Sequence, residues 1–438
     1  MSDDSTGGPQ RRAGTHPERP LLRAAIAGQS VTALVERFGT PVYVYDAATI
    51  EERIVDFARF DVVRFAQKAC SNIAILDLCR RNGVVVDAVS AGEIHRALVA
   101  GYKAGSDPAE IVYTADIFDR AALELCLEHD IPVNCGSIDM IDQYGRLAAG
   151  REITLRLNPG FGHGHSKKTN TGGEQSKHGI WHEHLTDALE RAAHHELVVA
   201  GVHVHIGSGS DMEHLSQVCD AVERLALEVG DSVTAISAGG GVPIPYQAED
   251  VYPDLDAYFE LWDATRQRLA AKFGHPVRLE IEPGRYLVAE AGNLIAEVRA
   301  TKGMGNNRFV LVDAGFNNLA RPVMYGAYQP MALTPARGDG ADRDVVDVIV
   351  GGPLCESGDI FTQGEGGMVR TQPLPEAKIG DFLIIGCAGA YGATMGSNYN
   401  SKPLAAEVLI EGGQAHLVRS RQTLEDLVRG ERIPERDT

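Results

Sequence analysis

The stretch Asp61-Val62-Val63-Arg64-Phe65-Ala66-Gln67-Lys68 opens the repeating pattern that decides the fold. Its apolar, β-branched part predicts a strand, and a helix is expected shortly after Lys68. A lysine at the end of such a strand is expected to point into the mouth of a parallel α/β sheet or barrel rather than out to solvent. Burial there would lower the pKa of its ammonium and make it a nucleophilic amine. The alternative is a strand-end lysine that simply reaches water.

Short β-branched runs then alternate with amphipathic stretches of helical length. The eight predicted strands cover residues 61–66, 83–89, 111–114, 131–134, 153–157, 198–205, 233–238 and 277–281. The predicted helices include residues 91–102, 118–129, 184–195 and 257–273. Eight strands with a helix between most neighbours is the count of a (β/α)8 TIM barrel. A doubly wound open sheet stays the alternative, because one sequence cannot show whether a sheet closes.

The pattern changes after about Val288, where strands follow one another through Gly-rich turns without intervening helices. These strands are predicted at residues 293–299, 309–313, 345–350, 382–385, 405–410 and 415–420. They predict an antiparallel β domain of the sandwich or barrel type, which the early strand 42–45 is expected to join. The predicted division is a disordered tail at 1–20, a barrel at 48–287, and a β domain formed by 21–47 plus 288–438.

Composition narrows the class of protein. The 438 residues include 60 acidic and 41 basic side chains, a formal net charge of −19, which argues against nucleic acid or an anionic membrane as a partner. The seven cysteines show no CxxC pair and no framework spacing, as expected for reduced thiols in the cytoplasm. No signal peptide and no long apolar run is apparent, so we expect neither export nor membrane insertion.

Two glycine-rich segments end the last two predicted barrel strands. Strand seven ends in Gly239-Gly240-Gly241, and strand eight ends in Glu282-Pro283-Gly284-Arg285. Function in parallel barrels lies at this end of the strands, where the loops after strands seven and eight often bind phosphate. Glycines let backbone N–H groups approach an anion closely, and Arg285 adds a guanidinium. We therefore predict a phosphate site that includes Gly240, Gly241, Gly284 and Arg285.

Strand six ends in His203-Val204-His205-Ile206-Gly207-Ser208-Gly209, and alternation puts both histidines on one face. They could be metal ligands, but no convincing third ligand is present, so we predict no metal. A flat ring from His205 at the rim and a hydroxyl from Ser208 fit a phosphorylated organic cofactor better. For His203 we expect the ordinary role of a hydrogen-bonded core histidine.

Glu282 narrows the cofactor to pyridoxal 5'-phosphate, whose ring nitrogen must stay protonated beside an acidic partner. A carboxylate beside the phosphate loops, facing the strand-one Lys68, has the required place. Asp87, at the end of strand two, could hold the free lysine as an ammonium. The alternative for Glu282 is a structural ion pair with a barrel arginine.

These segments together resemble the diaminopimelate decarboxylases, within the alanine-racemase-like fold of pyridoxal-phosphate enzymes that includes ornithine and arginine decarboxylases. The resemblance runs from about Pro41 to Leu427. Beyond the segments already quoted, it covers Pro41–Asp46, Asp87–Glu93, Arg156–Pro159, the long loop His163–Ile180, Arg321-Pro322 with Tyr325, Gly352–Asp359 and Gly389–Gly392.

The resemblance implies a role for each matching residue. Lys68 would form the Schiff base with the cofactor, His205 would stack on its ring and Glu282 would pair with the ring nitrogen. Cys355 would be the proton donor. The resemblance places five residues around the phosphate or the adjacent substrate carboxylate: Ser208, Gly241, Gly284, Arg285 and Tyr391. It places three at the distal end of the substrate: Arg321, Tyr325 and Glu356. In the family Cys355 and Glu356 reach the neighbouring subunit's site, which implies a homodimer.

The implied reaction is decarboxylation of meso-2,6-diaminopimelate to L-lysine and CO2. Arginines at the distal end suit a substrate with a second carboxylate. Two positions depart from the family pattern as we expect it: Gln329 stands where histidine is expected, and Lys402 stands where arginine is more usual. A related decarboxylase for lysine, ornithine, arginine or a D-configured amino acid therefore stays open. A silent cofactor-binding regulator is disfavoured, because both Lys68 and Cys355 are present.

Overall fold

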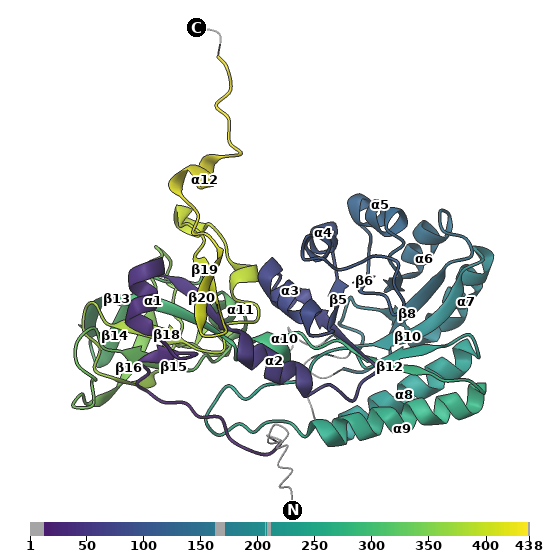
Figure 1. The fold of residues 1–438 in the computed structure, drawn as a ribbon, viewed down its shortest axis with the longest axis horizontal. Helices are drawn as coiled ribbons and strands as arrows, with labels where there is room; N and C mark the ends of the chain where they lie inside the picture. The colour runs from purple at the N-terminus through teal and green to yellow at the C-terminus, as the bar shows by residue number, and fades with distance from the viewer. Residues whose placement is uncertain (1–12, 163–170, 206, 208–211, 437–438) are drawn as a thin grey trace, which may run out of the picture. The chain divides into compact units, whose positions relative to one another are not determined.

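The computed structural model describes residues 13–162, 171–205, 207 and 212–436. Contacts divide the chain into two compact units (Figure 1). The first comprises Met1–Pro17, Thr49–Pro245 and Glu249–Leu287, and the second comprises Glu18–Ala48, Tyr246–Ala248 and Val288–Thr438. Part of the predicted tail, residues 1–12, lies outside the described residues.

In the first unit, eight parallel strands of the described chain close into a ring. The strands are β4 (Val62–Ala66), β5 (Val85–Ala88), β6 (Ile111–Ala115), β7 (Val133–Cys135), β8 (Glu152–Asn158), β10 (Val198–Val204), β11 (Ala235–Ser237) and β12 (Arg278–Ile281). Each pairs with the next, and β12 pairs with β4 to close the barrel. A short strand, β9 (Ile180–Trp181), is added beside the end of β8. The predicted barrel is confirmed, and the open-sheet alternative is wrong.

Helices surround this ring (Figure 1). They are α2 (Ala47–Val55), α3 (Ile73–Arg81), α4 (Ala91–Val99), α5 (Arg120–Glu128), α6 (Ile138–Gly145), α7 (Leu185–His194), α8 (Met212–Val229), α9 (Leu255–Phe273) and α10 (Arg285–Val288), with 3-10 turns η1 (Gln67–Ala69) and η3 (His182–His184). Asn72, Ser90 and Asp119 cap α3, α4 and α5 by accepting a backbone N–H with the side chain. These caps help to fix where each loop at the functional end of the barrel stops.

The barrel interior contains a buried ion pair. Arg64 of β4 donates from Nε to Glu280 Oε2 at 2.6 Å and from Nη2 to Glu280 Oε1 at 3.2 Å. Arg278 donates to the same carboxylate at 2.8 Å. Burial alone would raise the pKa of the Glu280 carboxyl, but Arg64 and Arg278 hold it below the ordinary value. The buried Glu280 carboxylate therefore depends on its arginine partners to stay charged.

Arg64→Met is expected to lower the free energy of unfolding by about 3–5 kcal/mol, because it leaves Glu280 buried without its main partner. Chemical denaturation measures this. The matched control is Arg59→Met, which removes a surface arginine bonded to Asp256 and Glu260 and should change stability little. Adding Glu280→Met to Arg64→Met should recover most of the loss; a single variant as stable as the parent would contradict the prediction.

The second unit is a sheet around the long strand β13 (Gly292–Met304). Its strand order is β17-β16-β14-β13-β3-β19-β20, and β18 pairs with both β13 and β15. The bounds are β3 (Val42–Asp46), β14 (Asn307–Val312), β15 (Met331–Thr334), β16 (Val345–Gly351), β17 (Gln372–Pro375), β18 (Phe382–Ile385), β19 (Ala406–Glu411) and β20 (Gln414–Arg419). A separate pair joins β1 (Ala25–Ile26) to β2 (Gln29–Ser30).

The sheet is mostly antiparallel, as predicted, but two of its pairings are parallel. β14 pairs in parallel with β16, and β19 pairs in parallel with β3. In the first case the connection passes through α11 (Arg321–Tyr325) and β15, and this crossover lets the two strands run the same way. In the second case β3 precedes the barrel in the chain and lies in this sheet between β13 and β19.

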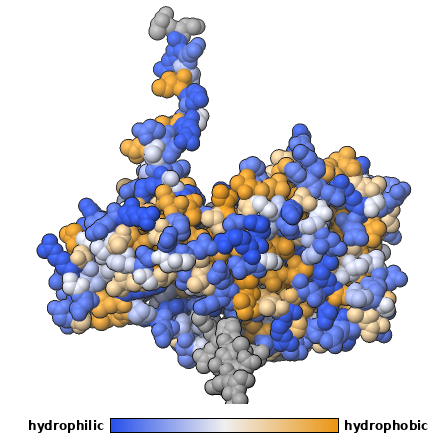
Figure 2. All heavy atoms as spheres, in the orientation of Figure 1, coloured by the Kyte–Doolittle hydropathy of each residue, from blue (hydrophilic) through white to orange (hydrophobic). Residues whose placement is uncertain are grey.

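The remaining elements of this unit are short, apart from α1 (Val31–Phe38), which packs Val31 and Leu34 into the apolar core with Val42, Val44 and Ile295. They are α12 (Leu424–Val428), η4 (Glu365–Gly367), η5 (Ala393–Met395) and η6 (Tyr399–Ser401). The segment after α12 extends away from the sheet and is mostly hydrophilic in Figure 2, although Ile433 is 91% exposed. Among the described residues, no helix combines the length and apolar character needed to cross a membrane.

Candidate active site

The predicted site residues of the first unit lie where the barrel strands end. Lys68 is in η1 directly after β4, and Asp87 is in β5. The others follow β10, β11 and β12; they are His205, Gly240, Gly241, Glu282, Gly284 and Arg285. Because the strands are parallel, these positions share the carboxyl end of the barrel. Ser208 lies outside the described residues.

Lys68 interacts electrostatically with other titratable groups at this end of the barrel, but its side chain is exposed. Its positive charge lowers the pKa of His205 and opposes the rise of the pKa of Asp87 and Glu93. The side chain of Lys68 is therefore less buried than expected. It lies near enough to Asp87 and His205 to change the pKa of both.

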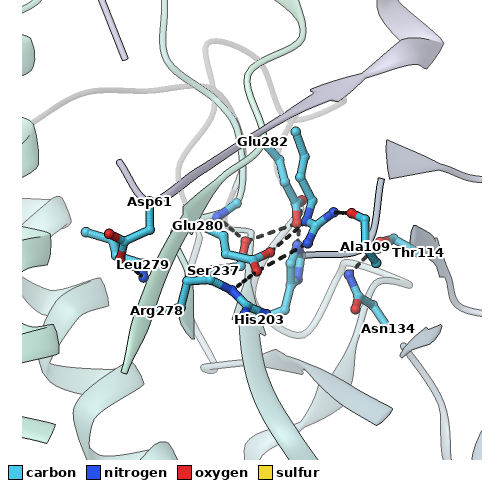
Figure 3. Close-up of polar contacts among 12 residues, drawn as sticks. Asp61, Ala109, Thr114, Asn134, His203, Ser237, Arg278, Leu279, Glu280 and Glu282 are labelled. Atoms are coloured by element: carbon cyan, nitrogen blue, oxygen red, sulfur yellow. Dashed lines mark hydrogen bonds and ion pairs between the residues drawn. The ribbon is translucent and has the colours of Figure 1, made fainter. Parts of the chain in front are cut away.

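Glu282 is held as a carboxylate by two donors below the barrel mouth (Figure 3). His203 Nε2 lies 2.7 Å from Oε2, and Ser237 Oγ donates to Oε1 at 3.0 Å. Burial opposes the charge, but His203 and Ser237 lower the pKa of Glu282 to about 2. The alternative was an ion pair with a barrel arginine, and the buried barrel arginine Arg64 binds Glu280.

The donor role of His203 and the contact of Ser237 were missed by sequence reasoning. His203 is buried, as expected of a core histidine, but its Nε2 faces the functional carboxylate. The available signal was alternation, because His203 lies two residues before His205 and Ser237 lies two residues before Gly239 on their strands.

His205 carries a neutral ring of fixed orientation. Its Nδ1 accepts a hydrogen bond from the backbone N–H of Gly240 at 3.0 Å. Burial and the charge of Lys68 lower the pKa of His205 well below the ordinary value. The contact requires a glycine, since a Cβ at Gly240 would lie 2.5 Å from the carbonyl oxygen of Glu282. The strand-seven glycines therefore hold the imidazole as well as leaving space.

Gly284 brings the strand-eight loop against the segment that carries Lys68. The backbone N–H of Ala66 donates to the carbonyl of Pro283 at 3.2 Å. A Cβ at Gly284 would lie 3.2 Å from the carbonyl oxygen of Ala66, so a larger residue would press on the end of β4. Arg285 follows immediately as the first residue of α10 and is half-buried.

Asp87 is buried beside Glu282, and burial together with that negative charge raises the pKa of Asp87 to about 8. A hydrogen bond from Thr114 counteracts part of this rise. Thr114 is in turn held by Asn134, whose Nδ2 donates to Oγ1 at 2.7 Å (Figure 3). Among the described residues, Asp87 Oδ1 has no hydrogen-bond partner. A group bound in the barrel mouth would supply such a partner.

Asp87→Asn is expected to flatten the pH dependence of stability in cofactor-free protein. With the pKa of Asp87 raised to about 8, the folded chain keeps a proton that the unfolded chain releases above about pH 4. Wild-type stability should therefore fall as pH rises from about 4 to 8, and the variant should lose that contribution. Denaturation at pH 5 and pH 8 measures it. Thr114→Val should steepen the fall, and identical slopes in all three proteins would contradict the assignment.

In the second unit, Cys355 and Glu356 lie together on the loop after β16. Both are exposed. Buried Asp359 shapes this loop, because its carboxylate accepts the backbone N–H of Leu354 and of Phe316, each at 2.8 Å. Asn400 Oδ1 accepts the N–H of Cys355 at 2.7 Å. These bonds fix the backbone of the loop that carries the exposed thiol and carboxylate.

Three other predicted residues also belong to this unit. Arg321 and Tyr325 are the first and last residues of α11, Arg321 buried and Tyr325 half-buried. Tyr391 has a positive φ of 56° in the segment between Gly389 and Gly392. A Cβ at Gly389 would lie 1.9 Å from the carbonyl oxygen of Val288, so this segment permits no side chain there.

Comparison with known proteins identifies the family. The family described as pyridoxal-dependent decarboxylase, pyridoxal binding domain, matches residues 48–289. The chain belongs to this family. It is 55% identical over 404 residues to diaminopimelate decarboxylase of Escherichia coli strain K12, covering 92% of this chain and 96% of the relative. The diaminopimelate decarboxylase of Streptomyces coelicolor is 54% identical over 95% of each chain.

Solved structures agree over both units. A crystal structure of diaminopimelate decarboxylase is 53% identical and superposes with a TM-score of 0.90, covering 94% of this chain and 99% of that chain. The Helicobacter pylori diaminopimelate decarboxylase crystallised with L-lysine is 30% identical with a TM-score of 0.79, covering 91% and 98%. The predicted family and its carboxy-lyase class are confirmed.

The residues at the barrel mouth fit pyridoxal phosphate. Glu282 is anionic, as a partner for a protonated ring nitrogen must be. His205 offers a neutral ring, and Asp87 Oδ1 is a buried acceptor that still needs a partner. Among the described residues, no group of three His, Cys, Asp or Glu side chains is arranged to hold a metal ion.

Proposed function

We propose that this protein decarboxylates meso-2,6-diaminopimelate to L-lysine and CO2. The observation that carries the proposal is that Lys68 and the anionic Glu282 both lie at the carboxyl end of the barrel and both act on Asp87, in a chain similar over both units to diaminopimelate decarboxylases. Pyridoxal phosphate, when bound, supplies the electron sink for the pair of electrons that CO2 leaves behind. The protein's part is to hold the cofactor, orient the substrate and supply protons.

Each barrel residue then has a definite task. Lys68 would attach the cofactor through its amine, and Asp87 lies near enough to interact with its charge. Glu282 would pair with the protonated ring nitrogen, since His203 and Ser237 hold its carboxylate anionic. His205 would support the ring of the bound cofactor. Phosphate binding falls to Ser208, Gly240, Gly241, Gly284, Arg285 and Tyr391.

Substrate recognition at the far end rests on opposite charges. Diaminopimelate carries there a second carboxylate and a second ammonium. Arg321 and Arg285 bind the carboxylate, for which a planar guanidinium is suited. Glu356 binds the ammonium, while Tyr325 and Tyr391 line the same part of the site. Ornithine lacks that carboxylate and would leave an arginine unpaired.

Cys355 donates the proton that replaces CO2, acting in a homodimer on the partner's site. The thiol and Glu356 are presented together on an exposed loop, which suits contact with a second chain. We place the protein in the cytoplasm. All seven cysteines lie in the described part of the chain and none forms a disulfide, which suits a reducing compartment.

The proposal is tested by incubating protein and pyridoxal phosphate with meso-diaminopimelate, and separately with D- and L-lysine, ornithine and arginine. Chiral mass spectrometry identifies the products. We expect L-lysine from diaminopimelate and no comparable turnover of the other amino acids. Turnover of ornithine, arginine or lysine in place of diaminopimelate would overturn the substrate while leaving the family intact.

A further inference from the structure

Arg321 is held by an aromatic partner within the second unit. Its side chain is buried, and Nη1 donates to the hydroxyl of Tyr246 at 2.8 Å. The guanidinium carbon also lies 5.0 Å from the centre of the Tyr246 ring. At this distance the ring face attracts the cation, so one tyrosine contacts the arginine through both hydroxyl and ring.

Gln329 provides a second partner on the same atom. Its side chain is fully buried just before β15. With the amide oriented to satisfy its surroundings, Nε2 donates to the carbonyls of Gly386 at 2.8 Å and Cys387 at 3.2 Å. Oε1 then accepts from Arg321 Nη1 at 2.8 Å. The two backbone carbonyls fix which end of the amide faces the arginine.

These contacts determine which edge of Arg321 remains available. Nη1 has two hydrogens, and Tyr246 and Gln329 accept one each. Among the described residues, no hydrogen bond involves Nε or Nη2 of Arg321. Those two atoms form the edge that binds a carboxylate through two parallel hydrogen bonds. The hydrogen bonds from Nη1 to Tyr246 and Gln329 thus orient the guanidinium, and they leave its Nε and Nη2 edge for a carboxylate.

We propose that Gln329 and Tyr246 are positioning residues that orient Arg321 for the substrate carboxylate farthest from the reacting bond. This rests on the proposed function, in which Arg321 binds that carboxylate. Glutamine suits the position because it offers donors to two carbonyls and an acceptor to the arginine. Leucine would remove both, and glutamate would direct a carboxylate oxygen at the Gly386 and Cys387 carbonyls. The unexpected residue at 329 is therefore a specificity determinant.

The test compares two ligands that differ by one carboxylate, L-lysine and 1,5-diaminopentane. In the holoenzyme, Gln329→Leu should raise the KM for diaminopimelate and weaken inhibition by L-lysine, each roughly 10- to 100-fold, as loss of a hydrogen bond to a charged group does. Inhibition by 1,5-diaminopentane and kcat should change much less. Tyr246→Phe keeps the ring contact and should give a smaller shift in the same direction. Gln329→His restores one donor and one acceptor, and should recover part of the loss.

The matched control is Gln372→Leu. Gln372 is also buried and donates to the backbone carbonyl of Gln329 at 3.3 Å, without contacting Arg321. It should lower stability without changing the preference for L-lysine. Gln329→Leu and Tyr246→Phe proteins that keep the wild-type preference would overturn the inference. So would a wild-type protein that binds L-lysine no better than 1,5-diaminopentane by calorimetry. Failure of wild-type protein to decarboxylate diaminopimelate would instead overturn the proposed function.

Discussion

Lys68→Ala is expected to reduce turnover by roughly 10⁴-fold or more, because it removes the amine that would attach the cofactor. The visible absorbance of the bound cofactor should disappear after dialysis, since the remaining contacts are non-covalent. Parallel measurements of absorbance and of CO2 release check both effects. Removing the positive charge of Lys68 should also raise the pKa of His205 and that of Asp87, because Lys68 lowers the first and limits the rise of the second.

The matched control is Lys272→Ala, which removes an exposed lysine in the last turn of α9. It should keep both the absorbance and the turnover of the wild type. A Lys68→Ala protein that stays yellow after dialysis would contradict the assignment and move the attachment to another lysine.

Cys355→Ala is expected to keep the cofactor bound and to lower kcat by roughly 10²- to 10⁴-fold, the usual effect of removing a general acid. Cofactor absorbance and single-turnover CO2 release separate binding from protonation. Cys219→Ala is the control, because it removes a buried thiol from α8 and should affect stability more than rate. Unchanged turnover in Cys355→Ala would place the proton donor elsewhere.

The same two variants test whether a site is shared between subunits. If Cys355 of one chain serves Lys68 of its partner, a mixed dimer of Lys68→Ala and Cys355→Ala chains contains one complete site. Random mixing should then restore up to about a quarter of wild-type activity, as half of the dimers are mixed and each has one intact site of two. A mixture as inactive as its components would contradict a shared site.

The fold was predictable to the extent that local pattern determines it. All eight barrel strands were found because each is a β-branched run between helical stretches, and closure became certain only from the pairing of β12 with β4. In the second unit, β15 was missed because it is a short run between Pro330 and Pro335. The parallel pairing of β14 with β16 depends on a crossover, which strand periodicity does not encode.

The site was predictable in its residues more than in their partners. Strand ends and glycine positions located Lys68, His205 and Glu282, because chemistry in a parallel barrel gathers at the carboxyl ends of strands. The contacts of His203 with Glu282 and of Gln329 with Arg321 arise from the folding of the chain. No regular spacing in the sequence predicts them. The exposure of Lys68 could not be read from the strand pattern, which predicts only that the residue follows a barrel strand.

The position of β3 in the second unit has a consequence for synthesis on the ribosome. Its neighbours are β13, which begins at Gly292, and β19, which begins at Ala406. At roughly 5–20 residues per second, the chain between β3 and β13 takes roughly 10–50 s to make. All the barrel strands are synthesised within that time, while the apolar side chains of Val42 and Val44 lack the sheet that later buries them. A chain that ends just before Gly292 should therefore contain every barrel strand and, ahead of them, an unpaired β3 that is exposed to misassociation.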